Sequence, residues 1–193
     1  MKSEQPMTKY YSSAPLKCKT GEMMLLNYNI TQRNLNDAPQ NSVSIHGDTH
    51  CQLNHEKVST YLLDLSNEYP NILNWYEKKV VPGLANGTRK LFVHIRNEKI
   101  IGLAIAKNEL KEKKICTVRV SPQMYGKGLG VRLFNEAMEW LDTSTPHVTV
   151  SESKFHLFER LFEHYGYRLT STHMSRYREG QVEYLFNEKI AFE

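Results

Sequence analysis

A glycine-rich bend between two apolar runs is the segment of this sequence best suited to bind an anion. The first amides of a helix lack acceptors within the helix and lie at the positive end of its dipole, so they can donate hydrogen bonds to a phosphate. Gly126, Gly128 and Gly130 place no Cβ atom between such amides and a ligand. The whole segment reads Val118-Arg119-Val120-Ser121-Pro122-Gln123-Met124-Tyr125-Gly126-Lys127-Gly128-Leu129-Gly130-Val131. We therefore expect a diphosphate-bearing ligand at this bend.

Two other phosphate-binding motifs rely on the same physics, and details of the sequence argue against both. A nucleoside-triphosphate loop ends in Gly-Lys-Ser or Gly-Lys-Thr, which this bend does not contain. A dinucleotide fingerprint usually opens a parallel βαβ unit, whereas this bend comes late in the chain, after a predicted hairpin. We therefore expect neither of these two motifs at this bend.

The bend resembles a signature of the GNAT superfamily, whose members are acetyl-CoA-dependent N-acetyltransferases. Their pyrophosphate signature, Gln/Arg-x-x-Gly-x-Gly/Ala, is similar to Gln123-Met124-Tyr125-Gly126-Lys127-Gly128, and the Val-x-Val-x-Pro lead-in and the following Leu-Gly are similar too. The order of predicted strands and helices resembles the family from roughly Leu91 to Phe186. The resemblance implies direct transfer of an acetyl or related acyl group from acetyl-CoA to a primary amine within a ternary complex.

The resemblance also assigns residues to acetyl-CoA, which would be the cosubstrate. The amides from Tyr125 to Val131 would bind the CoA diphosphate, and the main chain of Val118 to Val120 would pair with the pantetheine arm. An amide near Val120 would polarise the thioester carbonyl. The cofactor-binding residues implied in this way are Val118, Arg119, Val120, Gln123, Tyr125, Gly126, Lys127, Gly128, Leu129, Gly130 and Val131.

The sequence departs from the family pattern in its last predicted helix. Many members carry a tyrosine there, in a Tyr-x-x-x-Gly-Phe pattern, and this tyrosine protonates the leaving CoA thiolate. Here the segment runs from Phe162 to Tyr167, and Phe162 stands at the tyrosine's position without a proton to give. A thiol pKa of ~8.5 makes the thiolate a tolerable leaving group, so the loss need not abolish catalysis.

The acceptor amine must lose a proton, and this requirement directs attention to a predicted strand end. Glu152 follows the strand expected at 147–151, which in this topology ends where thioester and acceptor meet, so it is our candidate base. Ser153, like Ser151, could donate a hydrogen bond there. The alternative for Glu152 is a solvated carboxylate without a catalytic role.

A second group of chemically active residues lies earlier in the chain. Its potential ligands, at spacings that match none of the usual metal-binding patterns, are His46, Asp48, His50, Cys51 and His55. A polar segment with several histidines is more often a solvent-exposed loop. We therefore expect no metal, and we expect the segment to border the acceptor channel.

Length and composition indicate how many domains hold these residues. The chain has 193 residues, 40% of them hydrophobic, which suits one compact domain over residues 21–193 after a flexible leader at 1–20. Three cysteines without CxxC spacing suit a reducing compartment, and we expect a cytoplasmic protein without a membrane span. The formal charge of +4 is compatible with a polyanionic ligand.

The elements that must position these residues follow from hydrophobic periodicity. We expect an α/β (α+β) fold with a GNAT-like mixed central sheet of about six to seven strands flanked by about four helices. In chain order, the predicted elements are a strand at 23–30, a polar loop at 31–53, helices over 54–65 and 72–80, a hairpin at 91–95 and 100–105, a strand at 115–120, a helix including 133–141, a strand at 147–151, a helix over 155–165, and strands at 168–177 and 182–186.

The sequence does not identify the amine that accepts the acetyl group. A small-molecule amine, a protein amine and an aminoacyl-tRNA all fit the reaction, and a homodimer is compatible with the sequence. An inactive GNAT-like module that binds CoA or nucleic acid is an alternative, as is a GNAT-like toxin or modifier that acts on aminoacyl-tRNA or nucleic acid.

Overall fold

The computed structural model describes residues 34–35, 42–47 and 52–188, which contain a seven-stranded mixed sheet in the order β1-β2-β3-β4-β5-β7-β6. The strands are β1 (Val43–Gly47), β2 (Arg89–Arg96), β3 (Lys99–Glu109), β4 (Glu112–Val120), β5 (His147–Ser151), β6 (Leu169–Met174) and β7 (Val182–Phe186). The helices are α2 (His55–Leu63), α3 (Ile72–Trp75), a π-helical turn (Tyr76–Val80), α4 (Val81–Ala85), a 3₁₀ turn (Pro122–Met124), α5 (Leu129–Leu141), α6 (Glu152–Phe155) and α7 (Glu159–His164). The predicted α/β class is confirmed.

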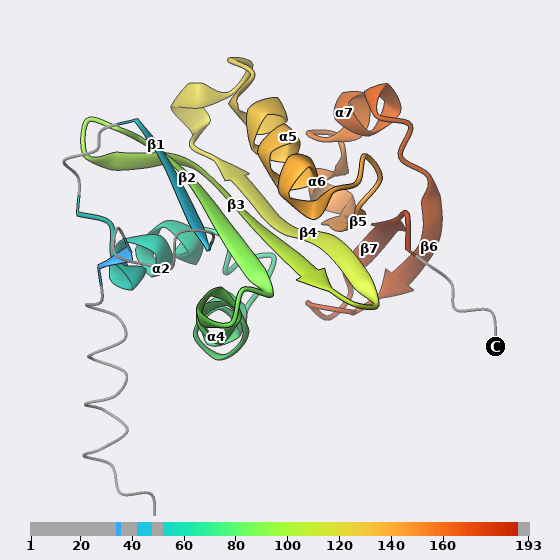
Figure 1. The fold of residues 1–193 in the computed structure, drawn as a ribbon. Helices are drawn as coiled ribbons and strands as arrows, with labels where there is room; N and C mark the ends of the chain where they lie inside the picture. The colour runs from blue at the N-terminus through green and yellow to red at the C-terminus, as the bar shows by residue number, and fades with distance from the viewer. Residues whose placement is uncertain (1–33, 36–41, 48–51, 189–193) are drawn as a thin grey trace, which may run out of the picture.

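Helices cover both faces of the sheet, which makes three layers (Figure 1). Helices α5, α6 and α7 lie on one face, where Leu133, Phe134 and Phe162 belong to one buried apolar cluster. Helices α2 and α4 lie on the other face, where Val58 and Tyr76 belong to a second cluster. Alternation along the strands divides the side chains between the two clusters.

Local sequence signals account for most of the predicted boundaries. The Asn54 side chain accepts a hydrogen bond of 2.9 Å from the Lys57 amide and so begins α2, as expected. Asn97 and Glu98 have positive φ angles of 50° and 59° and form the tight turn between β2 and β3. The hairpin, β4, β5 and the last two strands are confirmed within a few residues.

The N-terminal prediction was wrong in one respect. Residues 42–47, expected to belong to a polar loop, include β1, which pairs in parallel with β2. Val43 and Ile45 pack against the cluster on the α2 side, so tertiary pairing overrides the polar character of the surrounding sequence. The proposed leader at 1–20 and the proposed strand at 23–30 lie outside the described residues.

The helix predicted over 155–165 is divided into α6 and α7. Between them the amides of Leu157 and Phe158 donate to carbonyls three residues back, at 3.0 and 2.8 Å, which is the tighter 3₁₀ pattern. Phe155, Phe158 and Phe162 nevertheless all pack on the α5-side cluster. No helix in the described part of the chain is long and apolar enough to cross a membrane.

Candidate functional site

The site lies where two parallel strands part. β4 and β5 pair only at Lys114 with His147 and at Ile115 with Val148. Beyond these positions β4 continues to Val120 without a described strand beside it on that edge, so its main-chain groups there are available to a ligand. A cavity of about 960 Å³ occupies this region and extends to the start of α5, to α6 and α7, and to the segment between α2 and α3.

The glycine bend closes one end of the cavity. Gly126 and Gly128 have φ angles of 72° and 76°, a conformation that L residues rarely adopt, and a Cβ atom built on either glycine would meet nothing within 4 Å. Gly128 is the N-cap of α5, where no side chain of the described residues caps the helix and no acidic residue lies in the first turn. The first amides of α5 therefore lie beside open space without a competing acceptor, which suits a phosphate.

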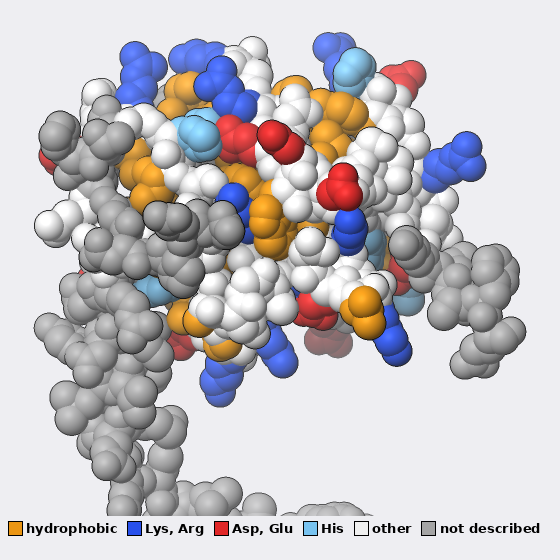
Figure 2. Space-filling model, in the orientation of Figure 1, with side chains coloured by type: hydrophobic (Ala, Val, Ile, Leu, Met, Phe, Trp, Pro, Cys, Tyr) orange, Lys and Arg blue, Asp and Glu red, His pale blue; other side chains and the backbone are white. Residues whose placement is uncertain are grey.

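Positive charge surrounds this bend. Lysine and arginine side chains gather at the upper left of Figure 2, where the bend precedes α5 in Figure 1. Lys127 and Arg132 are exposed beside it. A polyanion approaching the bend is attracted by these charges and by the helix dipole together.

The structure brings together most of the residues that the sequence assigned to the cofactor. The predicted residues that line the cavity are Val118, Arg119, Val120, Tyr125, Gly126, Gly128, Leu129, Gly130 and Val131. Gln123 and Lys127 do not line it; Gln123 is exposed in the 3₁₀ turn and Lys127 is exposed within the bend.

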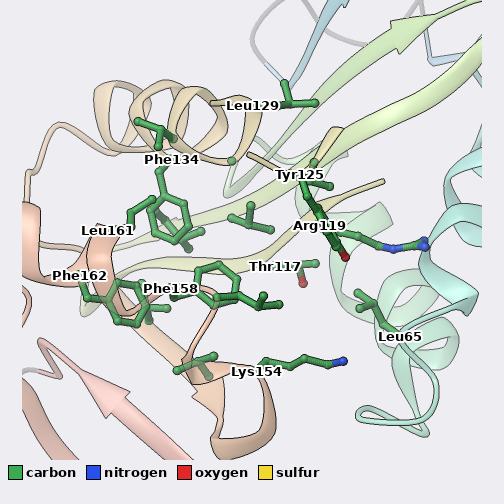
Figure 3. Close-up of a pocket in the computed structure, with 18 of the residues that line it drawn as sticks. Leu65, Thr117, Arg119, Tyr125, Leu129, Phe134, Lys154, Phe158, Leu161 and Phe162 are labelled. Atoms are coloured by element: carbon green, nitrogen blue, oxygen red, sulfur yellow. The ribbon is translucent and has the colours of Figure 1, made fainter. Parts of the chain in front are cut away.

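An aromatic wall forms another side of the cavity. Phe134, Phe158 and Phe162 lie together there in Figure 3, with Leu161 beside them. Phe162 is 2% exposed, and its ring centroid lies 4.9 Å from that of Tyr167 and 4.6 Å from that of Phe186. Phe162 therefore packs in the core and borders the cavity at the position where the family's tyrosine is expected.

This burial predicts how Phe162 responds to substitution. Phe162→Ala should lower the free energy of unfolding by ~3 to 5 kcal/mol, because it leaves a void among several rings. Phe162→Tyr should keep the ring and leave turnover unchanged or raised. Denaturant unfolding of both variants provides the measurement, with Leu110→Ala, at a fully exposed side chain, as a control expected within ~0.5 kcal/mol of wild type. Wild-type stability in Phe162→Ala would contradict the placement of α7.

The opposite end of the cavity carries charged side chains directed toward α2, as Figure 3 shows for Arg119 and Lys154. Arg119 pairs with Asp64 and lies over the ring of Tyr61, with its Cζ atom 4.2 Å from the ring centroid. Its Nη1 atom is buried without a hydrogen-bond partner among the described residues. Lys154 of α6 forms an ion pair of 2.9 Å with Glu68.

The segment between α2 and α3 covers this end and is attached to the turn between β6 and β7. Arg178 donates a hydrogen bond of 2.8 Å to the carbonyl oxygen of Asn67. The rings of Tyr69 and Tyr177 make an edge contact with centroids 5.4 Å apart. Tyr69 lines the cavity and lies near Ser151 at the end of β5. The segment that covers this end of the cavity is therefore held by a turn that is distant from it in sequence.

Glu152 and Ser153 lie at the end of β5, as the sequence indicated, but neither lines the cavity. Glu152 is exposed and accepts a hydrogen bond of 3.0 Å from the Tyr184 hydroxyl group. The Ser153 hydroxyl group lies 3.2 Å from that of Ser151 and accepts a bond of 3.1 Å from Gln181.

Glu183 is a functional candidate that the sequence analysis missed, because it lies within an ordinary apolar strand. It is fully buried, and neither carboxylate oxygen has a hydrogen-bond partner among the described residues. Strand pairing places it opposite Ser151, and its negative charge contributes to raising the pKa of Tyr69, after the larger effect of burial. Burial raises the pKa of Glu183 to about 7, against the lesser opposing effect of Arg176. Its proximity to Ser151 could not be predicted from the sequence, because it depends on the pairing of β7 with β5.

Comparison with known proteins places these features in a family. A model of the acetyltransferase (GNAT) domain matches residues 71–181, more than half of the chain. A protein described as a GNAT-family acetyltransferase from Desulfovibrio desulfuricans has a similar fold, with a TM-score of 0.56 and 15% identity over 69% of this chain and 92% of that one. No curated protein sequence matches significantly.

Two further solved structures hold the coenzyme. An aminoglycoside 6'-N-acetyltransferase complexed with coenzyme A has a TM-score of 0.48 and 12% identity over 68% of this chain and 87% of that one. A GNAT-family acetyltransferase from Elizabethkingia anophelis with acetyl-CoA bound has a TM-score of 0.43 and 16% identity over 57% of this chain and 82% of that one.

Proposed function

Because its sequence matches the family model over more than half its length, the chain belongs to the GNAT acetyltransferase family, and we propose that it transfers an acetyl group from acetyl-CoA to a primary amine. The observation that carries this proposal is the continuity of one cavity from the glycine bend to the gap between β4 and β5. The CoA diphosphate would lie on the amides of Tyr125 to Val131. The pantetheine arm would pair with Val118 to Val120 and bring the thioester into the gap.

Direct transfer in a ternary complex needs no acyl intermediate on the protein, and the environment of Cys116 supports this route. Cys116 lines the cavity, but burial raises the pKa of its thiol. Arg89 directs its Nη1 atom at the sulfur from 3.4 Å. A thiol held in its protonated form is a poor nucleophile, so attack by the acceptor amine itself is the simpler path.

The acceptor would enter from the α2 side and lose its proton there. We assign the role of proton acceptor to Glu183 in preference to Glu152, whose carboxylate is exposed and already accepts a hydrogen bond from Tyr184. Neither glutamate lines the cavity, but Glu183 has no hydrogen-bond partner among the described residues and lies opposite Ser151, at the strand end near the cavity residue Tyr69. The proton would pass to Glu183 through water beside Ser151 and Tyr69. A carboxyl with a pKa of about 7 is well matched to accept a proton near neutral pH.

The leaving thiolate requires less help than the amine. Phe162 cannot donate a proton, but a thiol pKa of ~8.5 allows the thiolate to depart and to be protonated by solvent. The main-chain amide near Val120 would stabilise the developing oxyanion of the thioester.

Release of free CoA thiol in the presence of defined amines tests the proposal. The acceptors to be compared are a small polyamine or amino sugar, a peptide amino terminus and an aminoacyl-tRNA. With one of these classes, the wild-type protein should release thiol faster than it does with acetyl-CoA alone. The acetylated product should be detectable by mass spectrometry. Acetyl-CoA binding without product formation for any acceptor would contradict the transferase assignment.

That last outcome would support a second candidate, a CoA-binding module without turnover. The phenylalanine at the family's tyrosine position favours it, because the usual proton donor is missing while the glycine bend is intact. The two functions predict the same acetyl-CoA affinity and differ only in product.

A further inference from the structure

Two histidines and a glutamate converge beneath α5, outside the cavity described above. His46 of β1 and His94 of β2 are partners in the parallel register, and their rings stack with centroids 4.7 Å apart and planes inclined by 18°. The Glu136 carboxylate of α5 lies 3.0 and 3.1 Å from His94 Nε2, and one of its oxygens lies 3.7 Å from His46 Nε2. We propose that these three side chains form a binding site for a divalent transition metal, with zinc as the best-suited ion.

The spacing of the three ligand atoms supports this proposal. Zinc bonds to nitrogen and oxygen ligands are ~2.0 to 2.2 Å long, so neighbouring ligand atoms of a tetrahedral site lie ~3.3 to 3.5 Å apart. The ligand atoms of His46, His94 and Glu136 already lie within 4.8 Å of one another. Side-chain rotations that move these atoms by about 1 Å would complete the arrangement. They come from three separate elements, so no sequence spacing could have indicated them.

The chemistry of the donor set favours zinc over magnesium or calcium. Two imidazole nitrogens and one carboxylate oxygen suit a borderline ion, while magnesium and calcium prefer oxygen ligands alone. His94 is buried and its Nε2 atom already lies at hydrogen-bond distance from both Glu136 carboxylate oxygens, so nitrogen and oxygen donors are placed to share one ion. The His46 side chain is 49% exposed, which gives water access to a fourth coordination position.

A bound ion would connect the sheet edge to the helix that carries the glycine bend. In the described sheet β1 is the outermost strand and pairs only with β2. Coordination through Glu136 would tie β1 to α5, so we expect zinc to stabilise this part of the fold. None of the three ligands lines the cavity proposed for acetyl-CoA, so the metal site can be tested independently of acetyl transfer.

Titration of tag-free, chelator-treated protein with Co²⁺ and Zn²⁺ tests the site. Co²⁺ should produce the visible absorption of a four-coordinate complex with one equivalent of metal. Zn²⁺ at about 100 times its Kd should raise the Tm by about 5 °C or more. His46→Ala and Glu136→Gln should each weaken Co²⁺ binding at least about tenfold. His156→Ala, at another exposed histidine, should bind as wild type.

The His46→Ala variant is the decisive one because its side chain is half-exposed and its loss leaves the core intact. A metal-free Tm equal to that of wild type would show that it folds. Absence of a Co²⁺ spectrum and of a Zn²⁺-dependent Tm shift in wild type would overturn the proposal. Equal Co²⁺ affinity in wild type and His46→Ala would overturn it as well, by locating the metal elsewhere.

Discussion

Gly128→Glu should weaken acetyl-CoA binding at least about 100-fold while the protein remains folded, because the new carboxylate would occupy the space proposed for the diphosphate. A like charge beside a phosphate costs several kcal/mol, and each ~1.4 kcal/mol is a factor of ten in affinity. A Cβ atom added there meets no protein atom within 4 Å. Loss of binding would therefore report on the ligand and not on a clash. Isothermal titration calorimetry with acetyl-CoA provides the measurement.

Gly87 supplies a matched control for this variant. Its φ angle is 77°, close to the 76° of Gly128, and a Cβ there also meets nothing within 4 Å. Gly87→Glu introduces the same charge and a similar backbone strain of ~1 to 2 kcal/mol, but outside the residues that line the cavity. It should bind acetyl-CoA with wild-type affinity. Unchanged affinity in a folded Gly128→Glu protein would remove the diphosphate from this bend.

Glu183→Gln should reduce kcat/KM by about 10²- to 10⁴-fold with the acceptor identified in the thiol-release assay, since that is the usual contribution of a general base. The substitution keeps the shape of the side chain and removes its ability to accept the proton. Acetyl-CoA affinity should be unchanged because Glu183 does not line the cavity proposed for acetyl-CoA. Glu152→Gln is the matched comparison, and it should retain most of the wild-type activity.

The pH dependence separates catalysis from packing. In wild type kcat/KM should rise with pH to a plateau above about 7, as Glu183 loses its proton, and Glu183→Gln should lack this limb. The stability should change in the opposite direction. The folded state holds a proton from about pH 4.5 to about 7 that the unfolded state releases, so wild-type stability should fall as the pH rises through that window and the variant should not show this fall. If Glu152→Gln loses the activity and Glu183→Gln does not, the base is Glu152.

The geometry of the bend proposed to bind the donor could be predicted from the sequence because its determinants are local. Gly126 and Gly128 belong to one contiguous bend, and their positive φ angles and the start of α5 follow from neighbouring residues. The periodicity of the elements from Asn54 to Phe186 is similarly local, and it predicted the α/β class and most strands to within a few residues.

The acceptor half depends on contacts between distant segments. Glu183 faces Ser151 only because β7 inserts between β5 and β6, and Tyr69 reaches that strand end from the other side of the sheet. His46 meets His94 through a parallel strand pair that the polar sequence around β1 concealed. Hydrophobic periodicity predicts which elements form, but not which polar side chains are then left without partners.

We propose that acetyl-CoA lies in the cavity between β4 and β5 with its diphosphate on the glycine bend, and a crystal structure of the protein with acetyl-CoA would show this. We expect phosphate density within hydrogen-bond distance of the amides between Tyr125 and Val131, the pantetheine arm beside Val118 to Val120, and the thioester near Ser151 and Tyr69. Acetyl-CoA bound elsewhere, with the bend free of phosphate, would contradict it.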